Sequence, residues 1–380
     1  MPSRIGFRIF PALLWIILSI FAAPAIGYAN NATVANVALG SRYGEDGYMQ
    51  IQFDLSWDNS WRNNVCRDAV WIFAKYKVTS NGTWNHCTLK VVTPNVSGYT
   101  VNPTNYSVGT EAAGQIPQIV VPSDKRGCFV ERASTGAGDM DITSIKILWD
   151  WATDGLTKTS TIYQIKVFAI EMTYIPLSAF GVGAAQDACA EGEFSMGAWF
   201  NFPGSITSEN AKTLYFSWDT SFLGNHDSCG MATADDFGSI TSQTLPAAFP
   251  KGYNAFYLMK YEISQGQYTD FLNSLSRGQE NNRVGSNITA DAPTDGSIYV
   301  MSSTTGISYR NTILCPSNGN GTTNSITFST TRPDRACNWL SWMDLAAFAD
   351  WTGLRPMTEL EFEKAARGNN WTYDDNEYAW

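Results

Sequence analysis

The sequence is poor in histidine, with only His86 and His226 among its 380 residues. A metal site built from several histidines is therefore excluded, and a zinc site would need cysteines in a CxxC spacing that the sequence lacks. The GxSxG turn of hydrolases, the glycine-rich phosphate-binding loop and the EF-hand loop are absent as well. These absences exclude the commonest zinc, serine-hydrolase, nucleotide-binding and EF-hand classes.

Positive charge is also scarce. The formal net charge is −10, and the 25 lysines and arginines are scattered along the chain. Nucleic-acid binding needs a clustered cationic face that neutralises phosphates, so no nucleic-acid partner is expected. The composition, with 44% hydrophobic and 13% aromatic residues, is that of a globular protein, and the length predicts two or three domains.

The N-terminus has the features of a secretory signal peptide. Arg4 and Arg8 supply its positive region, the apolar run IFPALLWIILSIFAAPAIG follows, and the small residues of GYA precede a cleavage site at Asn30. A membrane anchor is the alternative, but prolines bracket the run and no basic stop-transfer cluster follows it. We therefore expect residues 1–29 to be removed, and the mature protein to be secreted or held at the cell surface without a stable membrane span.

Residues 30–172 have the pattern of an all-β domain. The segment YMQIQFDLSW alternates between apolar and polar residues, and the runs DAVWIFAKYKV and WNHCTLKVV are separated by the turn TSNGT, which predicts a hairpin. Further β-rich runs follow without helical periods, so a β-sandwich is expected. His86 lies in this hairpin, and we expect both histidines to be structural or solvent-facing.

Helix signals begin only in the second half of the chain. Ser264 with Gln267 three residues later forms a capping box, and so does Ser341 with Asp344. Gly353 is placed to end the second of these helices. The first helix carries a stripe of core-facing residues at helical spacing, namely Tyr268, Phe271, Leu272 and Leu275.

The stretch GLRPMTELEFEKAARG contains three glutamates that could suggest an acid–base centre. Thr358 precedes Glu361 at the spacing of a capping box, and Glu359 stands in the first turn, where the helix dipole favours negative charge. Residues two apart on a helix point in different directions, so Glu359, Glu361 and Glu363 are not expected to converge on one site. The glutamates are predicted to begin a helix, whose buried face is formed by Leu360 or Phe362 together with Ala365 and Ala366.

Seven cysteines are present, which is an odd number. In an exported protein some of them should form disulfides, and one is left without a partner within this sequence. They are Cys66, Cys87, Cys128, Cys189, Cys229, Cys315 and Cys337.

Three phrases in fixed order resemble the formylglycine-generating enzyme, or sulfatase-modifying factor, domain. They are YIPLSAFGVG, MKYEISQGQYTDFLN and SWMDLAAFADWTGLRPMTELEFEKAARG, followed by EYAW at the end of the chain. The resemblance covers roughly Met172 to the end, and it implies an α+β, C-type-lectin-like module over residues 173–380. The chain departs from the family pattern in the displaced Pro356 and in Phe362, which stands where the family has tryptophan.

The resemblance implies an exported copper-dependent oxidase that converts a cysteine of a client protein to formylglycine. The family's copper-binding cysteine pair and its calcium ligands lie downstream of the last phrase, so we expect a C-terminally truncated module that is inactive by itself. Copper and calcium are then expected only in the full-length protein, with no catalytic, cofactor-binding or metal residue among these 380. Cys189, Cys229, Cys315 and Cys337 do not lie in the family's catalytic context and are expected to be disulfides or buried thiols.

The alternative is a non-catalytic protein. The same type of module also serves as a binding or structural part of secreted and cell-surface proteins, and fold alone does not decide function. A protein or glycan partner would then contact aromatic side chains, of which 14 are tryptophan and 17 tyrosine, although burial in the core is their commoner role. The sequence leaves both hypotheses open.

Overall fold

The computed structural model describes residues 31–43, 47–90, 107–111, 117–183, 195–196, 204–214, 223–224, 243–285, 299–302, 306–315 and 325–368. Up to residue 183 the described segments contain strands and no helix. The strands are β1 (Thr33–Tyr43), β2 (Tyr48–Arg62), β3 (Arg67–Lys77), β4 (Asn85–His86), β5 (Ser107–Glu111), β6 (Pro117–Val120), β7 (Cys128–Arg132), β8 (Gly136–Trp149), β9 (Gln164–Ile175) and β10 (Phe180–Val182).

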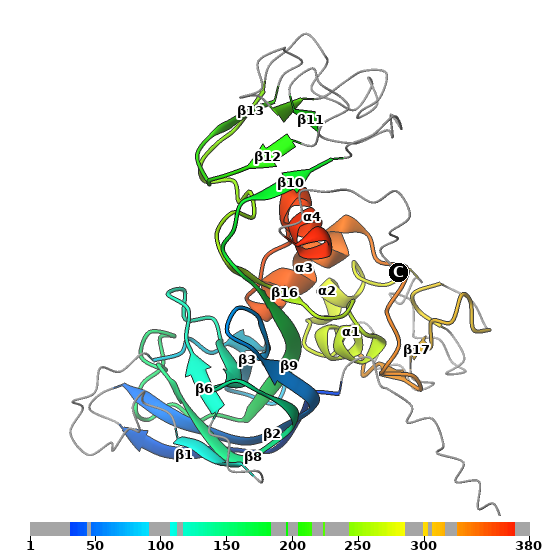
Figure 1. Ribbon diagram of the computed structural model, residues 1–380. Helices are drawn as coiled ribbons and strands as arrows, with labels where there is room; N and C mark the ends of the chain where they lie inside the picture. Colours follow the sequence, from blue (N-terminus) through cyan, green and yellow to red (C-terminus); the bar gives the residue numbers. More distant parts are fainter. Residues whose placement is uncertain are drawn as a thin grey trace, which may run out of the picture.

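Strands β1 to β9 belong to one ten-stranded sheet that curls on itself (Figure 1). Strand β3 pairs along its whole length with β9 and also contacts β7, whereas β2 pairs with β1 and β8. Strands β2 and β3 meet at the pair Arg62–Arg67. The predicted hairpin is confirmed by the pairing of β3 with the two-residue strand β4.

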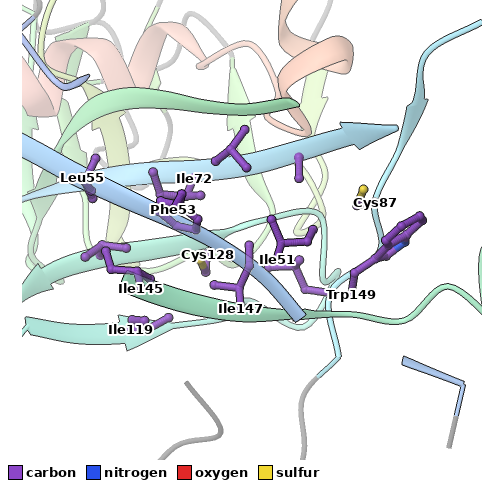
Figure 2. Packing of buried hydrophobic residues seen from close by; sticks show 14 of the residues in the cluster. Ile51, Phe53, Leu55, Ile72, Cys87, Ile119, Cys128, Ile145, Ile147 and Trp149 are labelled. Atoms are coloured by element: carbon purple, nitrogen blue, oxygen red, sulfur yellow. The ribbon is translucent and has the colours of Figure 1, made fainter. Parts of the chain in front are cut away.

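The concave side of the curled sheet encloses the first hydrophobic core (Figure 2). Ile51, Phe53 and Leu55 of β2 lie on the same face because strand side chains alternate, and they pack against Ile72 of β3 and Ile147 of β8. All five are at most 1% exposed. The β-rich character of the N-terminal part is thus confirmed, while a two-sheet sandwich stays a prediction.

The sheet continues across the predicted domain boundary. Strand β9 runs to Ile175 and pairs at Met172–Ile175 with β16 (Phe256–Met259), so residue 172 lies inside a strand. A second hydrophobic core forms between the outer face of β3 and β9 and the helices (Figure 1). It includes Trp71, Phe73, Phe271, Phe348 and Trp351.

The rest of the described chain contains short strands and four helices. The helices are α1 (Gln265–Leu272), α2 (Arg277–Glu280), α3 (Trp342–Thr352) and α4 (Glu359–Arg367). The short strands are β11 (Ser195–Met196), β12 (Gly204–Ile206), β13 (Lys212–Leu214), β14 (Leu223–Gly224), β15 (Gln243–Leu245), β17 (Ile313–Leu314) and β18 (Ser329–Thr330). None of the helices described is long and apolar enough to cross a membrane. The lectin-like arrangement of this part stays a prediction.

The local helix signals are confirmed. Ser264 and Ser341 each cap their helix, with Gln267 and Asp344 closing the two capping boxes. Gly353 ends α3 in the left-handed region at φ +75°, where a side chain would be strained. The core-facing stripe of α1 is buried at Tyr268, Phe271 and Leu272, and Leu275 packs against the same core.

Helix α2 carries a fully buried glutamate. The backbone N–H of Ile326 donates to the Glu280 carboxylate at 3.0 Å, and Arg277 Nη1 lies 3.5 Å from Glu280 Oε2. Burial nevertheless raises the pKa of Glu280 from 4.5 to about 7. The folded protein therefore binds this proton more tightly than the unfolded chain does. The resulting stability is fully present below pH 4.5 and is lost as the pH rises through about 7.

Replacing Glu280 by glutamine is therefore expected to flatten the pH dependence of stability. Between about pH 5 and pH 8, the variant should lose less unfolding free energy than the parent, by on the order of 2 kcal/mol. Urea denaturation at both pH values measures this difference. The exposed Glu262→Gln is the matched control and should keep the parent's slope, and an unchanged slope in E280Q would contradict the prediction.

Candidate functional site

The three glutamates of GLRPMTELEFEKAARG each have a separate environment. Thr358 Oγ1 accepts the Glu361 N–H at 3.1 Å, and Glu361 Oε2 accepts the Thr358 N–H at 2.9 Å. Burial favours the neutral acid, but the ion pair with Arg355 at 2.6 Å and the Thr358 N–H outweigh it and hold the pKa of Glu361 below its ordinary value. Glu361 is therefore a capping residue, as predicted.

The other two carboxylates of α4 do not approach that position. Glu363 accepts the Gly183 N–H at 2.7 Å and pairs with Arg367 at 3.0 Å, while Glu359 is exposed. An acid–base pair among the three is not formed. Of the two residues proposed for the buried face of α4, Leu360 is the buried one at 1% exposed, whereas Phe362 is 49% exposed.

The predicted burial of Ala366 is wrong, since this residue is exposed and Ala365 is only half-buried. The buried face of α4 instead includes Lys364, whose ammonium donates to the backbone carbonyls of Gly252 and Tyr253. A lysine whose ammonium finds two carbonyl acceptors can replace an apolar contact, and composition does not reveal such acceptors.

The contribution of the Thr358 cap to stability can be tested by substitution. Thr358→Ala should lower the free energy of unfolding by about 1 kcal/mol, because the Glu361 N–H loses its acceptor and the Pro250 carbonyl loses the Thr358 hydroxyl. Thr358→Ser keeps the hydroxyl and should retain most of the stability. Chemical denaturation of both variants measures the difference, and equal stability of alanine and serine would show that the cap is not energetically important.

The strongest candidate for a functional site lies where the N-terminal sheet meets the helices. A pocket of about 660 Å³ opens there between the hairpin of β3 and β4 and the helices α1 to α3. Its walls combine charged, amide and aromatic side chains. They include Lys75, Trp84, His86, Asp124, Arg126, Gln279, Asn282, Arg283, Asp350 and Trp351.

His86 is held at this pocket by two groups of the N-terminal part. Its Nε2 lies within hydrogen-bond distance of the Arg126 carbonyl, which can only accept, so the proton is assigned to Nε2. Nδ1 is then an acceptor for Lys75 Nζ at 3.2 Å. Burial and the Lys75 charge lower the pKa of His86 to about 4, which keeps the ring neutral. The expected structural role fits this geometry, while His226 lies outside the described residues.

Lys75 is the unusual group in the pocket. It is 6% exposed, and its Nζ lies 5.7 Å from the ring centre of Trp351 and 5.9 Å from that of Phe73. Its hydrogen-bond contact is with His86, and within the described part of the chain Lys75 forms no ion pair. Burial lowers the pKa of Lys75 to about 8. Sequence reasoning missed this residue, because Lys75 follows the apolar run of β3 close to Lys77 and nothing local indicates a pocket.

The five described cysteines are all free thiols. Burial raises the pKa of Cys128 and Cys337 to about 12 and that of Cys315 to about 11, and it also raises the pKa of Cys87. The predicted disulfides are therefore not found among these residues. Cys189 and Cys229 lie outside the described residues, so the pairing prediction now rests on them. The described segments also contain no cluster of three or more side chains suited to metal binding.

Comparison with known proteins gives a family match in the C-terminal part. Residues 230–380 match the family model described as the sulfatase-modifying factor enzyme 1-like domain. The match lies within the predicted module of residues 173–380 and confirms the family resemblance over the second and third sequence phrases, whereas YIPLSAFGVG lies before the matched range. No curated protein and no solved structure gives a significant match to the chain.

Proposed function

Because residues 230–380 carry a sulfatase-modifying factor enzyme 1-like domain, we propose that the chain is an exported protein of this type. In this proposal the described residues form the scaffold, and the β-rich N-terminal part is held against the family domain. The pairing of β9 with β16 and the common core around Trp71 and Trp351 support a fixed arrangement of the two parts. The family match is the observation that carries the proposal.

The corresponding activity is oxidation of a client cysteine to formylglycine, with copper and oxygen. Copper in such chemistry prefers thiolate ligands. Cys87, Cys128, Cys315 and Cys337 do not fit this role, because burial raises their pKa values and opposes thiolate formation. Cys66 belongs to no group of three candidate metal ligands among the described residues. Calcium is not accommodated either, since the described residues contain no group of three candidate ligands. We therefore derive no step through either metal and assign the oxidation to residues outside the described part.

The oxidase proposal is tested on the natural full-length gene product loaded with copper. A cysteine-containing peptide should acquire an aldehyde that a hydrazide probe traps, and mass spectrometry should place it at the cysteine. The same peptide with serine in place of cysteine is the control. No aldehyde at any copper loading would overturn the oxidase proposal in favour of the second candidate.

The second candidate is a non-catalytic secreted or cell-surface protein that binds a protein or glycan partner. The pocket between the β3–β4 hairpin and helices α1 to α3, called the junction pocket from here on, has a polar and aromatic lining that favours this binding role. We also propose a fold type for each part: a β-sandwich for residues 30–172 and a lectin-like module for residues 173–380. An experimental structure would test both. Removal of residues 1–29 would be tested by N-terminal sequencing of the exported protein, with Asn30 as the expected first residue.

Thiol labelling tests the scaffold role directly. Cys87, Cys128 and Cys315 are each 0% exposed, so they should react slowly with iodoacetamide in the native protein and rapidly in urea. The half-buried Cys66 is an internal control and should react first. Rapid native labelling of the three buried thiols would contradict their placement in the core.

A further inference from the structure

Three buried lysines in the chain differ in how their ammonium groups are satisfied. Lys251 donates to the carbonyls of Glu209, Pro246 and Phe249, and Lys364 donates to two carbonyls. Lys75 instead lines the pocket, and its hydrogen-bond contact is the ring nitrogen of His86. This amine is therefore not held by backbone carbonyls, and it is the one of the three that a molecule in the pocket can reach as a nucleophile.

The pocket gives this amine both access and a dry environment. Lys75 lines the junction pocket although only 6% of its surface is exposed, so a small molecule reaches it only by entering the pocket. Desolvation beside Trp351 and Phe73 disfavours the charged form and lowers the pKa of Lys75 to about 8. A desolvated lysine amine of this kind forms imines with carbonyl compounds.

We propose that Lys75 is the attachment site for a hydroxylated aldehyde that enters the junction pocket. The neutral amine Nζ adds to the aldehyde carbon, and a proton passes from nitrogen to the former carbonyl oxygen to give a carbinolamine. Loss of that hydroxyl as water forms the C=N bond, so one water leaves for each imine and no oxidant or reductant is needed. The site lies in the pocket whose lining favours the binding role, but imine formation at Lys75 requires neither proposed role.

The polar lining of the pocket indicates the class of aldehyde. Gln279 and Asn282 contribute amide side chains to this lining, and Asp124 and Asp350 contribute carboxylates. Amide and carboxylate groups hydrogen-bond hydroxyls and leave an alkyl chain without partners. A short polyhydroxylated aldehyde therefore fits better than an alkyl aldehyde of the same length.

The experiment is reductive trapping on the full chain. The protein is incubated with erythrose, an aldehyde bearing hydroxyls, and cyanoborohydride, and the adducts are mapped by peptide mass spectrometry. Lys75 should be modified roughly tenfold faster than Lys364, which is also buried and has a similarly lowered pKa but does not line the junction pocket. Trapping should increase as the pH rises through about 8, because the neutral form of the Lys75 amine then increases. The titratable and charged groups that face this amine are His86 and Cys87 at β4, Arg126 before β7 and Asp350 of α3.

Two variants separate this site from general lysine chemistry. Lys75→Arg keeps the charge but cannot form the imine, so the rapid adduct should disappear. Lys77→Arg removes a lysine two positions further along the same strand and should leave it in place. The mapping on the parent protein stands even if K75R folds poorly, and circular dichroism checks the fold of both variants.

The outcomes are distinct. No adduct at Lys75 in the parent, or labelling spread evenly over the exposed lysines, would overturn the proposed site. Butanal has the same carbon number as erythrose but no hydroxyls, and equal or faster trapping of butanal would overturn the assignment to hydroxylated aldehydes. Faster trapping of erythrose at Lys75, lost only in K75R, supports both parts.

Discussion

Replacing Trp71 by alanine is expected to lower the free energy of unfolding by about 3–5 kcal/mol. The side chain is 1% exposed, and its ring lies 4.8 Å from that of Phe129. Its indole Nε1 also donates to the Thr352 carbonyl at 2.9 Å, at the C-terminal end of α3. Truncation therefore leaves a cavity in the core that the two halves of the chain share and removes a hydrogen bond between them.

Two further variants separate the contributions of Trp71. Trp71→Phe keeps an aromatic ring but leaves the Thr352 carbonyl without its donor, so a loss of about 1–3 kcal/mol is expected. Trp342 is 64% exposed, and Trp342→Ala should change stability by less than about 0.5 kcal/mol. Urea denaturation followed by circular dichroism compares the three. A W71A variant as stable as W342A would show that the shared core does not couple β3 to α3.

Glu131→Ala is the second change with a large expected effect, a loss of about 3–5 kcal/mol. The Glu131 side chain is 0% exposed and pairs with Arg67 Nε at 2.6 Å and Arg62 Nη1 at 3.2 Å. It also accepts the Tyr257 hydroxyl at 2.7 Å, and burial together with this carboxylate raises the pKa of Tyr257. Alanine would leave two partly buried guanidinium groups and a partly buried phenol without their common partner.

A double-mutant cycle tests this network. Glu131→Ala and Tyr257→Phe should couple by about 1 kcal/mol or more, because both remove the same hydrogen bond between β7 and β16. The more exposed pair of Arg332 and Asp334 is the matched control, and Asp334→Asn should cost less than about 1 kcal/mol. Equal costs at Glu131 and Asp334 would contradict the assignment of a buried network at the junction.

The features that could be predicted from the sequence are the local ones. The boxes at Ser264, Ser341 and Thr358 involve residues three positions apart, so the helix starts depend on local backbone geometry. The β3–β4 hairpin is likewise specified by its turn. The family resemblance also rested on contiguous phrases, and the match to residues 230–380 confirms it.

Other predictions failed or stayed open because they depended on distant residues. An exported chain with seven cysteines predicts disulfides, but a disulfide forms only where the fold brings two thiols together, and the five described thiols are free. Ala365 and Ala366 were predicted on the buried face of α4 together with Leu360 or Phe362. Leu360 is buried there, but Ala366 is exposed and Lys364 is buried instead, because the carbonyls of Gly252 and Tyr253 accept its ammonium.

The amino-acid sequence alone therefore determined where the helices α1, α3 and α4 begin, where the β3–β4 hairpin turns, and which family the C-terminal part resembles, because those signals lie within a few neighbouring residues. Only the tertiary structure decided the junction. It buried Lys75 against Trp351, paired Glu131 with Tyr257 and placed the Trp71 indole on the end of α3. Desolvation and charge pairing depend on side chains that are distant in sequence, so the chemistry of the candidate site appears only after the chain has folded.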